Sequence, residues 1–555
     1  MFLCFEFSIS DDSCAAEYYG KLWGLRPGWL ANRLNDVSDA QWRNFRGNLP
    51  ILTAVFGAFT LVATTLRKIY HLKASGMSIV WLLISLIYLV YLHGACILFI
   101  VSIASVNFLL VKTFATTKYF SFVLWTFNLF FLICNRVYEG YSFSNFGQHL
   151  AYLDSLRGTF RWHLNGSSFP CCIYFLAVTL RMISFGYDYH WAQQGFRFDQ
   201  EKHVQRCSVC KAGRTCYLFL QERSLDGNKY SYSIYLCYLV YAPLYIAGPI
   251  ISFNAFASQI DVPQNIYSIK GVSLYGLRWI FSLSIIELMT HLFYYNAFAL
   301  SGLWKQLSAV DIFIIGYGVL NFMWLKFLLI WRYFRFWSLL NGIEAPENMP
   351  KCINNCHNLE SFWKSWHASY NKWLVRYIYI PLGGARTKLL NVWVIFTFVA
   401  LWHDLEWKLL SWAWLTCIFF VPEILLKSVA NTLQVESAIG KFFFHEMSAI
   451  SGAVTITCLM APSFWRIIWE SLYDDHSLMK IIGGSLKSEL TNLNFFLQIA
   501  NLVGFVVGPS GINFLISSFL HKEGLPVLGG MFFTFYLGTK LMFHIRDAQQ
   551  KTIFK

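Results

Sequence analysis

The sequence is poor in charged residues, and this shortage decides the class of protein. Charged side chains make up 13% of the 555 residues, whereas hydrophobic residues make up 56%. Soluble globular domains carry about 25% charged residues, because polar groups must cover their surface. This chain has too few polar groups to cover a soluble globule, and we therefore predict a polytopic membrane protein.

Acidic residues are the scarcer of the two charged types. The chain has 30 Asp and Glu against 44 Lys and Arg, which gives a formal net charge of +14. The cations are scattered through short loops and form no long block of like charge, so we expect no nucleic acid partner. The positive excess fits anionic headgroups, a phosphate-bearing substrate or the orientation of spans in a membrane.

The cysteines form no regular disulfide framework, and half of the fourteen lie in apolar runs as small hydrophobes. One polar loop carries Cys207 and Cys210 as a Cys-x-x-Cys pair, with His203 before it and Cys216 after it. These four residues would satisfy tetrahedral zinc. Since no second Cys-x-x-Cys exists, a solvated loop with reduced or acylated thiols is the simpler interpretation, and we assign no metal site.

A second group of thiols lies at Cys352 and Cys356, followed by His357. A thiolate site for a metal or haem is one interpretation, and a short reduced loop is the simpler one. We therefore expect no bound cofactor. The chain also shows no internal repeat, which weighs against a transporter built from inverted halves.

Long apolar runs predict an all-α transmembrane helical bundle with about eleven spans, give or take two. We expect an amphipathic lead-in over residues 1–49, a transmembrane domain over 50–545 and a short polar tail over 546–555. The run 77–111 corresponds to roughly 50 Å of helix, too long for one span, so two spans meet near His93. The remaining runs are 50–66, 120–134, 169–182, 232–252, 272–300, 310–331, 389–401, 409–426, 442–460, 495–520 and 527–542.

Two segments are expected to be irregular or to lie at the membrane surface. Leucines and arginines at helical spacing predict an interfacial helix over 143–163. Pro243 and the Ala-Gly-Pro at 247–249 should kink the span 232–252. A kink leaves backbone carbonyls that must find new partners inside the protein.

Polar chemistry gathers in one segment, residues 361–384, and in the Trp402 and His403 pair that follows. As a continuous helix, residues 366–373 would place His367, Tyr370 and Asn371 on one face. The Pro-Leu-Gly-Gly at 381–384 should then turn the chain. Five cations would suit a phosphate-rich ligand, although contact with lipid headgroups explains each of them equally well: Lys364, Lys372, Arg376, Arg386 and Lys388.

The two histidines of this region are candidates for proton transfer. Imidazole is the natural general base near neutral pH, because its ordinary pKa is about 6.5. His403 as an interfacial anchor of a helix end, and His367 as a satisfied core histidine, explain the spacing equally well. The residues alone leave these alternatives open.

A family resemblance favours the catalytic alternative. The segment resembles the membrane-bound O-acyltransferases (MBOAT), in the branch of the glycerol-uptake proteins and hedgehog acyltransferases, through the motifs Phe362-Trp363-x-x-Trp366-His367-x-Ser369-x-x-x-Trp373, Arg376-Tyr377-x-Tyr379-Ile380-Pro381-Leu382-Gly383-Gly384 and Trp402-His403. The resemblance implies an MBOAT-type core with a reaction cavity through the membrane. It also implies that His403 is the catalytic base and His367 the second active-site residue. The hedgehog acyltransferases have an acid at that second position, so His367 favours a hydroxyl acceptor.

The resemblance therefore implies an acyl-CoA-dependent O-acyltransferase. We expect it to move a long-chain acyl group from acyl-CoA to a hydroxyl of a lipid, such as a lysophospholipid or a glycosylphosphatidylinositol (GPI) anchor. His403 and His367 would be catalytic, and Asn371 with the five cations would bind substrate. We expect a multi-pass protein of the endoplasmic reticulum membrane. The alternatives are a transporter of a small solute such as glycerol and a catalytically silent scaffold.

Overall fold

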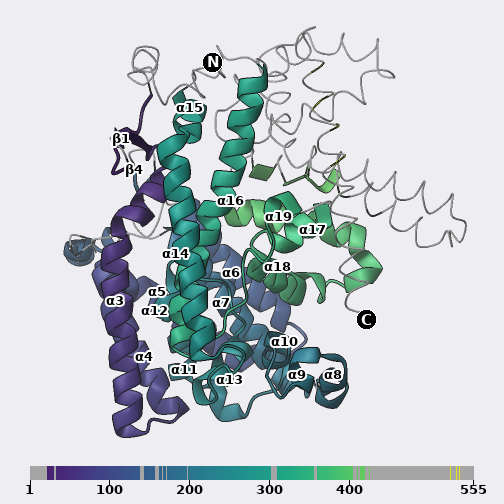
Figure 1. Cartoon of the computed structure of the whole chain (residues 1–555). Coiled ribbons are helices and arrows are strands. Elements are labelled where there is room, and N and C mark those ends of the chain that lie inside the picture. Colours follow the sequence, from purple (N-terminus) through teal and green to yellow (C-terminus); the bar gives the residue numbers. More distant parts are fainter. Residues whose placement is uncertain are drawn as a thin grey trace, which may run out of the picture.

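The computed structural model describes residues 22–403 with short gaps, and isolated positions in 409–424 and 526–537. The gaps are 31–32, 138–142, 155, 157–161, 165–166, 170–171, 197, 302–308 and 356–358. This part of the chain is predominantly helical (Figure 1), which confirms the predicted helical membrane bundle. The spans expected at 442–460 and 495–520 and the tail 546–555 lie outside the described residues, as does most of 409–426 and 527–542.

Five helical stretches of the described residues are long and apolar enough to cross a membrane. They are α3 (Ala40–Tyr70), the pair α4 (Ala74–His93) and α5 (Ile97–Phe114), α14 (Ile269–Leu292), α16 (Ala309–Leu340) and α19 (Lys388–His403). Two further long helices, α6 (Phe120–Val137) and α7 (Cys172–Gln193), pack together beside α5.

The predicted break near His93 is confirmed. Helix α4 ends at His93, and a short 3-10 turn, η1 (Gly94–Cys96), separates it from α5. Gly94 has a φ of 58°, a left-handed conformation that other residues rarely adopt. The glycine therefore divides an apolar run that is too long for a single crossing.

The run 232–252 is divided further than a kink requires. It forms α11 (Tyr232–Val240), α12 (Ala242–Tyr245) and an extended segment before α13 (Phe253–Asp261). The buried Arg181 of α7 donates hydrogen bonds to the carbonyls of Tyr238, Leu239 and Leu244, at 3.1, 2.7 and 2.7 Å. These are the carbonyls around the break, and Arg181 satisfies them inside the protein as the kink predicted.

The prediction of an interfacial α-helix over 143–163 is wrong. The segment forms 3-10 turns η2 (Phe143–Phe146) and η3 (Gln148–Asp154), followed by a hairpin of β3 (Trp162–Leu164) and β4 (Ser167–Phe169). The Asp154 carboxylate accepts the N–H groups of Phe143 and Ser144, both at 2.9 Å. This carboxylate closes a compact turn, and local capping outweighs the helical spacing of the leucines.

The chain before α3 forms a small antiparallel hairpin of β1 (Leu25–Pro27) and β2 (Leu34–Asp36). Asp39 caps α3 by accepting the N–H of Trp42 at 2.7 Å, so the helix begins ten residues before the apolar run. The remaining short elements are α8 (Gln200–Arg206), α9 (Ser208–Lys211), α10 (Tyr217–Glu222), η4 (Gly227–Tyr230), α15 (Tyr295–Ser301), η6 (Ile353–Asn355), α17 (Leu359–Ser365), α18 (Ala368–Leu374), the π-helical η7 (Val375–Tyr379) and η8 (Gly384–Thr387).

Candidate active site

The central polar segment is not one helix, and it breaks at His367. Helix α17 ends at Ser365 and α18 begins at Ala368, so the continuous helix expected over 366–373 is wrong. His367 has a φ of 50°, a left-handed conformation that is uncommon for a residue with a side chain. Such a conformation costs about 1–3 kcal/mol. Residues that adopt it are frequent at functional sites, where the surrounding structure holds them in place.

Asn348 holds the strained turn from a neighbouring loop. Its backbone carbonyl accepts the N–H of Ala368 at 2.9 Å, and its side-chain Oδ1 accepts the N–H of Ser369 at 3.0 Å. Asn348 is fully buried and thus supplies the first-turn acceptors of α18. The His367 side chain makes no cap hydrogen bond to the helix. Its ring is therefore free for another task.

Aromatic rings bring the two candidate histidines to one place. The His367 ring lies 4.4 Å from the Trp331 ring, 5.4 Å from Tyr370 and 6.3 Å from Trp402, measured between centroids. Trp402 in turn lies 4.8 Å from the ring of His403. The structure thus joins His367 and His403 through a shared tryptophan, although they come from different helices.

A glycine turn makes this meeting possible. The predicted turn lies at residues 381–384, where Gly383 and Gly384 have φ values of 100° and 60°. Thr387 closes it by donating its hydroxyl hydrogen to the carbonyl of Leu382 at 2.7 Å. The chain reverses there, so α19 runs back along the central segment and its last residue, His403, returns to the level of His367. Only residues that tolerate positive φ can make this reversal cheaply.

Three polar atoms at this site are buried and lack a hydrogen-bond partner among the described residues: His367 Nδ1, the Tyr370 hydroxyl and Trp402 Nε1. Other buried polar atoms of the described residues are in the same state, Trp42 Nε1 and the Tyr241 hydroxyl among them, and these three differ in belonging to rings that contact one another. His403 is exposed at the end of α19.

Burial lowers the pKa of His367 below its ordinary value, and the nearby His403 adds to this effect. The charged imidazolium is disfavoured where water is scarce. His367 therefore remains neutral near pH 7, with one ring nitrogen that donates and one that accepts.

Arg376 lies away from this pair, inside the protein. Its guanidinium donates to Asp188 Oδ1 at 3.2 and 3.3 Å, to the carbonyl of Gln221 at 3.0 Å, and to the carboxylate of Glu222. It also lies over the Trp191 ring at 4.8 Å. The sequence reasoning missed Asp188, although a carboxylate within a largely apolar helix is itself a signal.

The other predicted binding residues are distributed along the segment. Lys364 pairs with Glu360 at 2.6 Å, and the Lys372 ammonium lies 5.3 Å from the centroid of the Tyr217 ring. Asn371 is half-buried one turn after His367, and its N–H donates to the His367 carbonyl at 3.1 Å. Two more cations flank the glycine turn, the exposed Arg386 and the half-buried Lys388. The structure therefore brings Asn371 next to His367 and leaves the cations spread over a wider surface.

The thiol group considered before the motif is only partly described. Cys352 is half-buried in the loop before α17, whereas Cys356 and His357 lie outside the described residues. The structure does not test a metal or haem at this position.

The glycine turn and the ring contacts thus bring His367, Trp402 and His403 together in a helical membrane bundle. The chain belongs to the membrane-bound O-acyltransferase (MBOAT) family, whose members match residues 81–461. It is 32% identical to the membrane-bound O-acyltransferase gup1 of Schizosaccharomyces pombe over 537 residues, which cover 95% of this chain and 83% of that protein.

Two further relatives place the chain within the family. It is 30% identical to the membrane-bound O-acyltransferase GUP1 of Saccharomyces cerevisiae, over 95% of this chain and 85% of that protein. It is 26% identical to the mouse protein-cysteine N-palmitoyltransferase HHAT over 43% of this chain and 50% of that protein. The predicted family is thereby confirmed, and the chain is a multi-pass membrane acyltransferase of the glycerol-uptake-protein type.

Proposed function

We propose that this protein transfers a long-chain acyl group from acyl-CoA to a hydroxyl of a membrane lipid. The observation that carries the proposal is the meeting of His367 and His403 around Trp402. Family membership supports acyl transfer, and the two imidazoles supply a base and a hydrogen-bond donor at one site.

The reaction needs no covalent intermediate on the protein. His403 accepts the proton of the acceptor hydroxyl while its oxygen attacks the carbonyl carbon of the thioester. His367 donates a hydrogen bond to the carbonyl oxygen as negative charge builds on it, with Asn371 beside it to position a reactant. The tetrahedral intermediate then expels the CoA thiolate, which takes the proton from His403. The products are a lipid ester and free CoA, and both histidines return to their starting state.

The cations that remain accessible are candidates for the CoA phosphates. Arg386 and Lys388 flank the glycine turn, while Lys364 and Lys372 lie on α17 and α18. Arg376 has its donors engaged by Asp188, Gln221 and Glu222, so we propose a supporting role for it. We propose a lysophospholipid or the lipid of a GPI anchor as the acceptor, and the endoplasmic reticulum as the membrane.

The test is acyl transfer by purified membranes given labelled long-chain acyl-CoA. We expect His403→Ala to abolish labelling of lipid, with normal accumulation of the protein. His149→Ala is the matched control, because His149 is exposed in η3, away from the site. Retained turnover in His403→Ala would contradict the assignment of the base. Label found on protein rather than lipid would contradict the proposed acceptor.

The same preparations separate this proposal from the transporter alternative. We expect proteoliposomes containing the protein to take up labelled glycerol no faster than empty liposomes when acyl-CoA is absent. Uptake that persists in His403→Ala would instead favour transport.

A further inference from the structure

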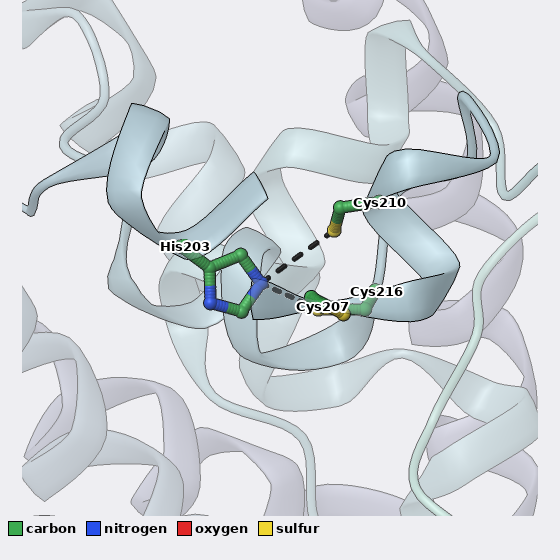
Figure 2. A group of neighbouring side chains, drawn as sticks. All are labelled: His203, Cys207, Cys210 and Cys216. Atoms are coloured by element: carbon green, nitrogen blue, oxygen red, sulfur yellow. Dashed lines mark hydrogen bonds between the residues drawn. The ribbon is translucent and has the colours of Figure 1, made fainter. Parts of the chain in front are cut away.

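Four potential metal ligands converge in the polar loop between α7 and α11, well separated in sequence from the acyl-transfer site. His203 comes from α8, Cys207 precedes α9, Cys210 lies within α9, and Cys216 precedes α10. Figure 2 shows their side chains directed toward one another. Their ligand atoms all lie within 4.8 Å of each other. The simpler interpretation of a solvated loop with unrelated thiols does not explain this convergence.

The spacing of the atoms fits one tetrahedral zinc ion. Zinc–sulfur and zinc–nitrogen bonds of about 2.3 and 2.0 Å place neighbouring sulfurs about 3.8 Å apart and nitrogen and sulfur about 3.6 Å apart. His203 Nε2 lies 3.2 Å from the Cys216 sulfur and 3.5 Å from the Cys210 sulfur. Small shifts of these side chains would therefore complete the coordination without moving the backbone.

No disulfide joins the three cysteines, so all of them are available as ligands. The N–H of Phe219 donates to the Cys216 sulfur at 3.4 Å, a hydrogen bond of the kind that orients metal-bound sulfur. A zinc ion with three thiolates and one imidazole carries a net charge of −1, and the same loop carries four exposed cations: Lys202, Arg206, Lys211 and Arg214.

The loop also needs such a centre to hold its shape. Helices α8, α9 and α10 have 7, 4 and 6 residues, and helices this short are not stable alone. Among the described side chains, α8 buries none and α9 buries only Cys210. Hydrophobic packing is therefore too small to fix α8 and α9, whereas α10 buries Leu220 in the core and one ion can join the other two helices to it.

We propose that His203, Cys207, Cys210 and Cys216 bind a structural zinc ion that fixes α10 against the catalytic segment. Helix α10 carries Gln221 and Glu222, which hold Arg376 of η7. The first residue of α10, Tyr217, accepts the N–H of Ser252 at 3.0 Å. The ion thus supports the packing of α10 against η7, which belongs to the same central segment as His367. This inference concerns metal binding and does not rest on the proposed reaction.

The first experiment measures metal in the whole purified protein in detergent. We expect about one zinc ion per chain by elemental analysis. A thiol reagent that modifies these cysteines should release it in the same proportion. Growth with Co²⁺ should give the visible absorption of tetrahedral cobalt bound to thiolates. Folded protein with less than about a tenth of an ion per chain, or with two of these cysteines joined in a disulfide, would overturn the proposal.

The second experiment compares matched cysteine variants. Cys210→Ser should lower the zinc content at least tenfold and lower the melting temperature in detergent. Cys134→Ser, which changes a half-buried cysteine of α6, should keep both values at the level of the unchanged protein. His203→Cys retains four ligands and should keep zinc. Full zinc content in Cys210→Ser, or equal loss in Cys134→Ser, would refute the site.

Discussion

Replacing Arg376 by Gln should destabilise the protein rather than weaken binding of acyl-CoA. Asp188 is 1% exposed and Arg376 is 6% exposed, so their ion pair is almost free of water. The substitution removes the counterion and two hydrogen bonds of at most 3.3 Å from Asp188. It leaves the carboxylate with the N–H of Asn254 at 2.9 Å and the Tyr377 hydroxyl at 3.0 Å.

The size of the effect follows from this burial. Removing one partner of a buried ion pair costs about 3–5 kcal/mol, because the other charge stays buried without compensation. Replacing both partners is far less harmful, since the buried Asp188 carboxylate is then gone and Glu222, the other partner of Arg376, is only half-buried. We therefore expect the double variant Asp188→Asn with Arg376→Gln to recover a large share of the stability lost by Arg376→Gln alone.

The assay is thermal unfolding in detergent, together with the KM for acyl-CoA. An unfolding entropy of about 2.1 cal/mol/K per residue gives about 1 °C per kcal/mol for a chain of 555 residues, so Arg376→Gln should lower the melting temperature by about 3–5 °C. Arg386→Gln is the comparison, because Arg386 is exposed at the glycine turn and should change KM without changing stability. A stable Arg376→Gln protein with a raised KM would refute this reasoning and would indicate that Arg376 binds acyl-CoA.

Two further substitutions test the geometry that joins the histidines. Gly383→Ala should lower the free energy of unfolding by about 1–2 kcal/mol, because φ is 100° there and a Cβ would lie 3.0 Å from Thr387 Oγ1. Gly47→Ala is the control, because a Cβ there meets open space, and it should leave the melting temperature unchanged or slightly raised. Asn348→Ala should cost about 1–3 kcal/mol and lower kcat, since the N–H of Ser369 loses its acceptor. Asn354→Ala, in an exposed part of the same loop, should retain wild-type kcat, and an equal loss there would contradict the positioning role of Asn348.

The class of protein and the candidate residues of the site could be predicted from the sequence. Low charge and long apolar runs predicted the helical membrane bundle, and the aromatic motif around His367 and His403 predicted the family. The glycine turn at 381–384 and the break near His93 were also predictable, because glycine and proline act on the backbone locally. Features of this kind depend only on residues that are neighbours in the sequence.

The roles of single polar residues were less predictable. Arg376 and Arg386 are both cations of the same segment, yet one is buried against Asp188 and the other is exposed. Nothing in the spacing distinguishes them, since the distinction depends on which distant helix lies opposite. Asn348 gave no signal at all, because its partners are backbone N–H groups of a helix twenty residues further along.

The sequence alone determined that this chain is a membrane protein of the acyltransferase family, and it singled out His367 and His403 as the candidate catalytic pair, because composition and a specific motif carry that information. Only the tertiary structure decided that the helix breaks at His367 and that the turn returns His403 to its side. It also decided that His203 and three cysteines meet in one loop. These outcomes depend on contacts between segments far apart in the chain, where packing selects one of several locally acceptable conformations.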